Sequence, residues 1–152
     1  MKNDSVAAAN PKAFHDYFIE DKYEAGLVLS GTEVKSLREG RASLRDAFAR
    51  IENNEIFLHH CHISPYSHGN RANLDPLRVR KMLMHRDEIR KLIGKSQQRG
   101  YTLVPLKIYF KKGRAKVELA LGIGKKSADK RESLKKKISD REMQAAFKRK
   151  SR

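Results

Sequence analysis

The sequence predicts a mainly β domain, a small closed or nearly closed antiparallel barrel with added helices. Apolar and polar residues alternate over 104–110 and again over 117–123, on either side of Lys112-Gly113, as in a hairpin with one buried face. Asn53-Asn54 is a strong turn signal between two shorter runs. About six short strands of this kind are typical of an OB-like barrel, a common platform for single-stranded and loop RNA.

The first quarter of the chain is expected to enter this barrel after a flexible arm. Residues 1–13 are polar and alanine-rich, which predicts a mobile N-terminal segment. Phe14–Ile19 is predicted to be the first strand, and Asp21-Lys22 a turn into the second. That second strand is expected over Tyr23–Leu29, because aromatic and β-branched residues alternate there.

Two helices are predicted from capping signals and apolar spacing. In the first, Thr32 is expected as the N-cap and Gly40 as the stop. The second is clearer, with His85 as the N-cap, Glu88 three residues later as in a capping box, and Gly100 at the end. Its apolar residues recur at helical spacing, at Ile89, Leu92 and Ile93.

The middle strands and the connections between elements follow from turn residues and charge. Strands are expected over 44–51 and 55–61, on either side of the asparagine turn. Residues 64–76 contain two prolines and several Asn, Ser and Asp residues, which predicts a long loop. A barrel domain is therefore expected over 14–124.

Residues 125–152 form a basic tail by composition. They contain 12 basic and four acidic residues, and their apolar residues are too sparse for a core. We expect this tail to be disordered alone and to become helical against a polyanion. Aid to solubility, or nonspecific binding to nucleic acid, is the simpler alternative.

Bulk charge points to a polyanionic partner. The formal net charge is +16 and the isoelectric point is near 10.1, so nucleic acid is the first candidate and an anionic membrane surface the competitor. No stretch approaches the ~18 apolar residues of a spanning helix, and the start lacks the apolar segment of a signal peptide. The single cysteine, Cys61, suits a reducing cytoplasm.

Catalytic and metal chemistry have little support. His59-His60-Cys61-His62 could suggest a metal site, but adjacent strand residues point to opposite faces and zinc ligands are usually more widely spaced. No phosphate-binding glycine loop or nucleophile elbow is present. We therefore expect no enzyme activity, no metal and no cofactor; a metal-dependent nuclease would rest on the histidines alone.

Three blocks of sequence, in order, resemble the small protein B family, the bacterial SsrA-binding proteins. The first is EAGL at 24–27 followed by GTEVKSLR at 31–38, and the second is ANLDPLRVRKMLMH at 72–85. The third is GKK at 124–126 with DKR at 129–131. The resemblance extends from about Phe14 to the C-terminus, and it implies an OB-like barrel followed by a tail that is unstructured in solution.

The resemblance implies an adaptor for ribosome rescue. Its members bind transfer-messenger RNA (tmRNA, or SsrA RNA) at the tRNA-like end and deliver it to stalled ribosomes, where the tail enters the decoding centre and the empty mRNA channel. Elongation factor Tu would be an indirect partner through the aminoacylated RNA. The chain is then expected to be monomeric, cytoplasmic and not membrane-bound. The alternative is a structural barrel that binds ribosomal RNA permanently.

Candidate contact residues come partly from charge and partly from this resemblance. Glu24 is a carboxylate among basic residues that could accept hydrogen bonds from RNA, although a surface salt bridge would explain it as simply. His85 lies at a helix start, where backbone N–H groups favour phosphate, whereas Leu83 is by itself more typical of a core. The predicted RNA contacts are Glu24, Lys35, Arg38, Arg78, Arg80, Lys81, Leu83, His85, Gly124, Lys125 and Lys126.

The resemblance also assigns a ribosome-binding role to the tail. Met82 and Met84 stand where leucine is usual, and the tail has no tryptophan near Met143, which makes its distal contacts less defined. The predicted ribosome-binding residues are Asp129, Lys130, Arg131, Lys135, Lys136 and Arg141.

Overall fold

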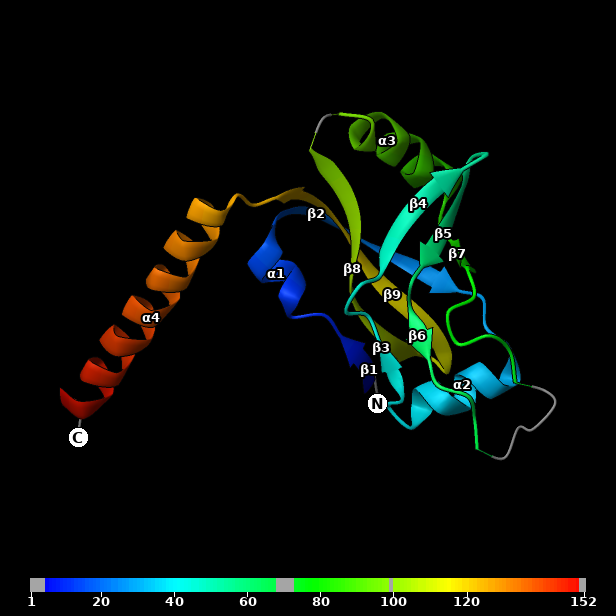
Figure 1. The fold of residues 1–152 in the computed structure, drawn as a ribbon, viewed down its shortest axis with the longest axis horizontal. Helices are drawn as coiled ribbons and strands as arrows, with labels where there is room; N and C mark the ends of the chain where they lie inside the picture. Colours follow the sequence, from blue (N-terminus) through cyan, green and yellow to red (C-terminus); the bar gives the residue numbers. More distant parts are fainter. Residues whose placement is uncertain (1–4, 68–72, 99, 151–152) are drawn as a thin grey trace.

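The computed structural model describes residues 5–67, 73–98 and 100–150. The chain forms nine strands and four helices over these residues (Figure 1). Their order is β1 (Ser5–Ala9), α1 (Lys12–Asp16), β2 (Tyr17–Leu27), α2 (Gly31–Arg38), β3 (Ala42–Ser43), β4 (Phe48–Glu52), β5 (Glu55–His59), β6 (His62–Ile63), β7 (Arg80–Leu83), α3 (Arg86–Ser96), β8 (Tyr101–Lys111), β9 (Arg114–Gly124) and α4 (Ser127–Lys150).

Six strands close into a ring, which confirms the predicted OB-like antiparallel barrel. The main sheet has the order β1-β8-β4-β5-β7-β2-β9, and the further pairing of β8 with β9 closes it. The short pair β3 and β6 forms a separate sheet. Because every ring strand has two neighbours, closure leaves the ring with few unpaired backbone groups.

Both hairpin turns predicted from the sequence are confirmed. Asn53 and Asn54 have φ of 52° and 62°, and the pairing of Glu52 with Glu55 makes them a two-residue turn. Lys112 and Gly113 occupy the same left-handed region between β8 and β9. Positive φ at both positions gives the turn the same twist as the strands it joins. The predicted strand over 44–51 begins later, at β4.

The N-terminal predictions are wrong in three respects. Residues 5–13 of the predicted arm over 1–13 are not a mobile segment, because they form β1, which pairs with β8, and the start of α1; residues 1–4 lie outside the described part. No strand spans 14–19, and no turn occurs at Asp21-Lys22. Instead β2 runs without a break through both positions, and its pairing with β9 shifts register between Ile19 and Lys22. Buried Asn10 anchors the segment by donating from its side chain to the Pro105 carbonyl at 3.0 Å.

Helix α2 begins two residues earlier than predicted. Its N-cap is Ser30, not Thr32: the Glu33 N–H donates to Ser30 Oγ at 3.3 Å, and the Ser30 N–H donates to Glu33 Oε1 at 2.9 Å. This reciprocal pair is a capping box. Helix α3 does start after His85, but the His85 side chain makes no capping hydrogen bond, and the helix ends at Ser96 rather than near Gly100.

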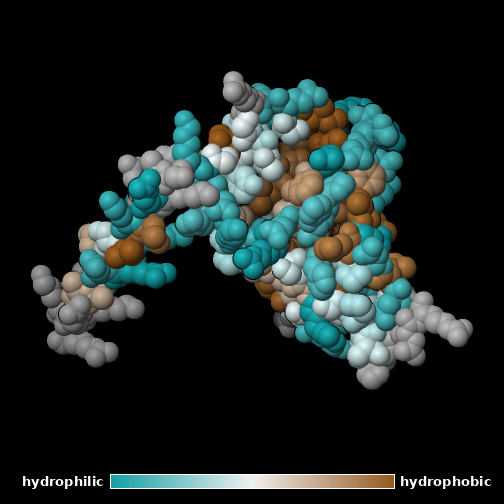
Figure 2. Space-filling view, viewed as in Figure 1, coloured by the Kyte–Doolittle hydropathy of each residue, from teal (hydrophilic) through white to brown (hydrophobic). Residues whose placement is uncertain are grey.

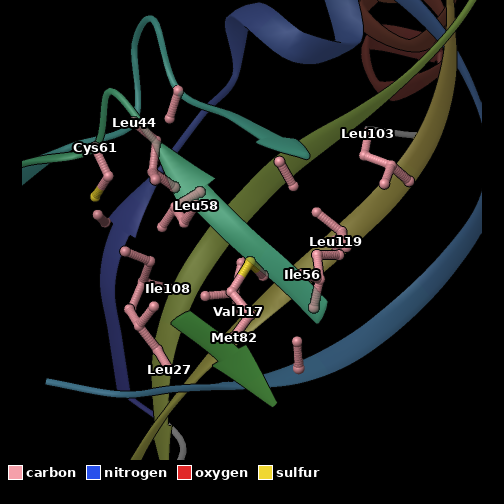
Figure 3. Close-up of a cluster of buried hydrophobic side chains, with 14 of the residues drawn as sticks. Leu27, Leu44, Ile56, Leu58, Cys61, Met82, Leu103, Ile108, Val117 and Leu119 are labelled. Carbon is pink, nitrogen blue, oxygen red and sulfur yellow. The ribbon is translucent and has the colours of Figure 1, made fainter. Parts of the chain in front are cut away.

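The main apolar cluster lies inside the barrel and includes the inward faces of the ring strands (Figure 3), and a smaller cluster packs α1 against β8 and β9. Leu58 and Ile56 of β5 are fully buried, as are Val117 and Leu119 of β9. Each such side chain contributes roughly 1.5–3 kcal/mol to folding by leaving water. The alternation that predicted β8 and β9 separates buried from less buried residues over 107–110 and 117–119, whereas 103–106 and 119–122 are buried on both faces.

Helix α4 extends away from the barrel (Figure 1) and is largely hydrophilic, with a small hydrophobic group along its length (Figure 2). Its exposed apolar side chains are Leu134, Ile138 and Met143. A change from disorder to helix on binding a polyanion stays a prediction. None of the helices described here combines the length and apolar character that crossing a bilayer requires.

Candidate nucleic-acid interface

The outer face of β7, β2, β9 and β8 brings together residues from distant parts of the sequence. In β2, Ala25 and Leu27 point into the core, so Glu24 and Gly26 point outward. Gly26 pairs with Leu83 of β7 on one side and with Lys116 of β9 on the other. We call this the Glu24 face.

Glu24 is a fixed, charged acceptor on this face. The Tyr109 hydroxyl donates to its Oε2, and Lys111 Nζ lies 3.5 Å from the same atom. The hydrogen bond from Tyr109 is the main cause that lowers the pKa of Glu24; burial opposes it, and Lys111 and Lys116 lower the pKa further. The side chain is 40% exposed, so a charged carboxylate with accessible oxygens faces the solvent among lysines.

Leu83 lies beside Gly26 on the outer surface rather than in the core. It is 55% exposed, and a Cβ at Gly26 would come within 3.3 Å of Leu83 Cβ. Glycine at position 26 therefore lets the Leu83 side chain approach the β2 backbone closely. Lys81, which also points outward from β7, forms an ion pair with Glu55 at 2.6 Å.

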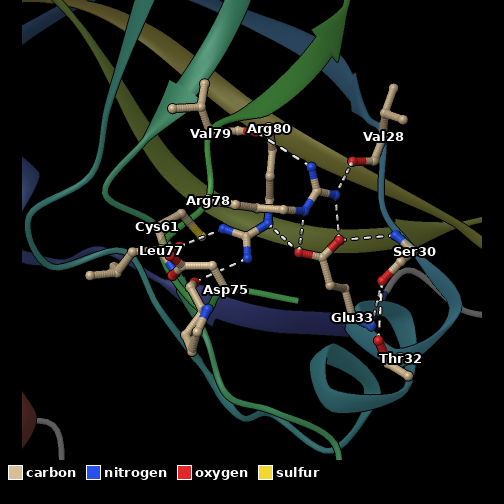
Figure 4. Close-up of polar contacts among 11 residues, drawn as sticks. Val28, Ser30, Thr32, Glu33, Cys61, Asp75, Leu77, Arg78, Val79 and Arg80 are labelled. Atoms are coloured by element: carbon tan, nitrogen blue, oxygen red, sulfur yellow. Dashed lines mark hydrogen bonds and ion pairs between the residues drawn. The ribbon is translucent and has the colours of Figure 1, made fainter. Parts of the chain in front are cut away.

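A buried ionic cluster joins α2 to Arg78 and to Arg80 of β7 (Figure 4). Glu33 accepts from Arg78 through Nε at 3.0 Å and Nη2 at 2.5 Å, and from Arg80 Nε at 2.7 Å. Burial alone would raise the pKa of Glu33, but the hydrogen bonds from Arg78, Ser30 and Arg80 outweigh it, so the pKa is lowered. We call Glu33, Arg78 and Arg80 the Glu33 cluster.

Arg80 must be withdrawn from the predicted RNA contacts. Its side chain has 0% exposure, and its Nη1 and Nη2 donate to the carbonyls of Cys61 at 2.6 Å and Pro76 at 3.0 Å. Arg78 is partly exposed but also engaged, donating to the Val28 carbonyl at 3.4 Å. The guanidinium of Arg80 donates to groups of the protein itself and is not available to RNA. A buried guanidinium is tolerated only when its hydrogen bonds are satisfied in this way.

The remaining predicted basic residues of the barrel lie elsewhere on its surface. Arg38 packs over the Phe110 ring at 4.2 Å and donates to the Gly113 carbonyl at 3.4 Å. Lys35, on the same helix, lies 5.5 Å from the ring centre of Tyr66. His85 is at the N-terminus of α3 as predicted. The structure thus gathers Glu24, Lys81 and Leu83 but leaves Lys35 and Arg38 on α2.

A second basic region begins where β9 ends. The Lys125 N–H donates to the Asp16 carbonyl at 2.8 Å, and its Nζ donates to the Phe14 carbonyl at 3.1 Å. Gly124 pairs with Tyr17 in the last step of the ladder. These contacts fix the point from which α4 departs.

The predicted tail residues lie on α4. Arg131, Lys135, Lys136 and Arg141 are exposed, whereas the side chains of Asp129 and Lys130 lie outside the described residues. Lys126, at the junction, is also exposed.

Sequence reasoning missed the Glu33 cluster and Tyr109. A signal for Glu33 was present, because Ser30 and Glu33 have the spacing of a capping box. Nothing local could have indicated that Tyr109, 85 positions from Glu24, donates to it. Among the described residues no group of three or more His, Cys, Asp or Glu side chains could hold a metal ion.

Together, a closed basic barrel, an ordered carboxylate among lysines and a cationic helix leading from one end define an RNA-binding barrel protein. The SmpB protein family matches residues 7–149, so the chain belongs to that family. The SsrA-binding protein of Geobacillus thermodenitrificans is 62% identical over 142 residues, covering 93% of this chain and 92% of the relative. That of Bacillus subtilis strain 168 is 61% identical over the same length, covering 93% and 91%.

A solved structure agrees with this assignment. A chain described as "tmRNA-SmpB: a journey to the center of the bacterial ribosome" matches with a TM-score of 0.68 at 51% identity, covering 83% of this chain and 92% of the other. The family predicted from the three sequence blocks is therefore confirmed.

Proposed function

We propose that this protein is the RNA-binding adaptor of ribosome rescue. It binds the tRNA-like end of tmRNA, carries that RNA to stalled ribosomes and places its tail in the decoding centre and the empty mRNA channel. The names of the relatives support an SsrA-binding role, and the matched structure is described with tmRNA and the ribosome. Elongation factor Tu would take part only through the aminoacylated RNA, and the protein itself would be monomeric, cytoplasmic and not an enzyme.

The single observation that carries the RNA contact is the environment of Glu24. A carboxylate with a lowered pKa stays charged at neutral pH, and the hydrogen bond from Tyr109 holds it in place. Such a group accepts hydrogen bonds from a base edge or a ribose 2′-hydroxyl and repels phosphate. The surrounding lysines attract the phosphate backbone of the RNA, and the Glu24 carboxylate then orients the bound RNA.

The tail supplies a separate function at the other end of the barrel. Helix α4 carries exposed basic side chains at Arg131, Lys135, Lys136 and Arg141, which suit a channel lined by ribosomal RNA. An mRNA in that channel would exclude the tail because both need the same volume. An empty channel is then the condition for binding, and the Asp129–Arg131 segment acts there after RNA binding.

The first experiment is a titration of tmRNA and an ordinary tRNA with wild type and Glu24→Ala over a range of salt. We expect a preference for tmRNA that survives moderate salt and is lost in the variant. Glu20→Ala is the matched control, because Glu20 lies on the same strand and accepts from Tyr101 at 3.2 Å much as Glu24 accepts from Tyr109. Equal, steeply salt-dependent binding of both RNAs by every variant would mean that charge alone explains binding.

A second experiment separates the adaptor from a permanent structural protein of the ribosome. Asp129→Ala combined with Lys130→Ala should keep tmRNA binding but lose tagging of stalled products. A structural protein would show no such separation of the two functions.

A further inference from the structure

A cluster of planar side chains lies on the outer face of the β4–β5 hairpin, on the far side of β7 from β2. The rings of Phe48 and His59 stack with centroids 5.1 Å apart and only 4° between their planes. The His60 ring lies 5.2 Å from Phe48, tilted by 50°. The guanidinium of Arg50 lies over the Phe48 ring at 5.5 Å from its centre. We call these four residues the hairpin patch.

The backbone keeps these planar groups together. Phe48 and His59 are direct cross-strand partners, and Arg50 follows two positions later on the same outward face. His60 has φ of 59°, a left-handed conformation that ends β5 and is compatible with its ring turning back to Phe48. A histidine pays a cost to adopt this backbone, so the arrangement is fixed by the fold rather than formed by chance among mobile side chains.

The hairpin patch is open to solvent at Arg50, which is 59% exposed, and at His60, which is also exposed. Phe48 is partly buried, and the His59 side chain is only 16% exposed, with its Nε2 3.9 Å from Glu52. The acidic residues nearby lie towards the Asn53-Asn54 turn: Glu52 is 3.8 Å from Arg50, and Glu55 pairs with Lys81. Neither pair removes its cation from solvent, and exposed pairs of this kind hold weakly.

The patch is also continuous with the Glu24 face. Phe57 of β5, which points outward between Phe48 and the turn, is the cross-strand partner of Lys81 on β7. A strand of RNA that leaves the Glu24 face over Lys81 therefore meets planar side chains next. Base–aromatic and base–guanidinium stacking is the usual way in which barrels hold unpaired bases.

We propose that the hairpin patch is a second RNA-contact site, which binds an unpaired base by stacking on Arg50, Phe48 and His60, with Lys81 and Arg50 attracting the flanking phosphates. This goes beyond the proposed contact at Glu24, because it concerns a different pair of strands and a different mode of recognition. The ligand chemistry is a single-stranded nucleotide, whether it belongs to tmRNA or to ribosomal RNA.

The test uses the full chain and a single-stranded RNA of about 10 nucleotides, within the usual site size of such barrels, carrying 2-aminopurine, whose fluorescence falls when it stacks. We expect Phe48→Leu and Arg50→Gln each to weaken binding and to lose most of the quenching. Stacking on an aromatic group corresponds to a roughly five- to hundredfold change in affinity. Arg50→Gln alters only an exposed side chain, so it tests the site even if Phe48→Leu fails to fold.

Phe14→Leu is the matched control. Phe14 is 42% exposed and has Lys22 over its ring at 5.7 Å, so it is another exposed phenylalanine with a cation but lies on α1. Loss of the Phe14 ring should leave quenching unchanged. Wild-type quenching in both patch variants, or an equal loss in Phe14→Leu, would overturn the proposal.

A photo-crosslinker in place of Phe48 then identifies the source of the RNA. Crosslinks to tmRNA or to ribosomal RNA would each support the site and show which strand occupies it, and the absence of crosslinks to both would refute it. The proposed function fails separately, through tmRNA titrations in which Glu24→Ala has no effect.

Discussion

Replacing Glu33 by alanine should destabilise the protein more than the loss of a surface charge would. The change leaves two guanidinium groups without their common carboxylate, and one of them, Arg80, is completely buried. Removing one partner of a buried ion pair costs roughly 3–5 kcal/mol, because the remaining charge is left unpaired. Domains are stable by only about 5–15 kcal/mol, so a large part of the folding free energy depends on this cluster.

The effect is measured by thermal and urea unfolding, followed by circular dichroism. At about 2–4 °C per kcal/mol for a chain of this size, Glu33→Ala should lower Tm by roughly 6–20 °C. Glu39→Ala is the control: Glu39 follows the same helix, is 46% exposed, and its Arg41 partner is 4.0 Å away. That change should stay within about 0.5 kcal/mol. If the two variants lose the same stability, the reasoning about the Glu33 cluster is refuted.

The same cluster predicts an acid sensitivity with a definite sign. The pKa of Glu33 is lower in the folded protein than its ordinary value of 4.5, so the unfolded chain takes up the proton first. The contribution of Glu33 is therefore complete above pH 4.5 and is lost as the pH falls through the lower folded pKa. Glu33→Gln should show a smaller loss of stability than wild type between pH 5 and pH 3, about the range where carboxyl groups titrate.

Two further predictions concern single buried positions. Gly122→Ala should lower the free energy of unfolding by about 1–3 kcal/mol through overpacking, because the added Cβ would lie 3.1 Å from Tyr17 Cβ. Gly124→Ala is the control for a urea titration, because an added Cβ there has nothing within 4 Å and should leave stability unchanged. Equal effects of the two changes would contradict the packing argument. Cys61 has 0% exposure, and burial raises its pKa to about 11, so native protein should resist iodoacetamide at pH 8 and react only in urea; rapid native alkylation, detected by mass, would show that the thiol is accessible.

Local signals predicted the parts of the fold that local physics controls. The asparagine turn and Lys112-Gly113 were readable because few residues adopt positive φ without strain. The stripe at Ile89 and Leu92 was readable because helix period and burial coincide there. The N-terminal segment was misread because β1 is a strand only by pairing with β8, about 100 positions away in register; its own residues, SVAAA, are ambiguous.

The candidate site shows the same division more sharply. Glu24 could be singled out in the sequence as a carboxylate among cations. The family resemblance assigned the same RNA-contact role to Leu83. Arg80 was assigned to RNA because an arginine between Arg78 and Lys81 looks like part of a basic surface. In a strand alternate side chains face opposite sides, and only the pairing of β7 with β2 and β5 decides which of them is inside.

The sequence by itself therefore determined the barrel class, both hairpins, the start of α3, the basic tail and the family, because each depends on residue type, local spacing or motif order. The tertiary structure decided which charged side chains lie on the surface and which are buried and hold the fold together. Charge is visible in a sequence, but burial depends on strand register and on partners that lie tens of positions away. That is why Arg80 is held inside by Glu33, Cys61 and Pro76, while Glu24 is held outside by Tyr109.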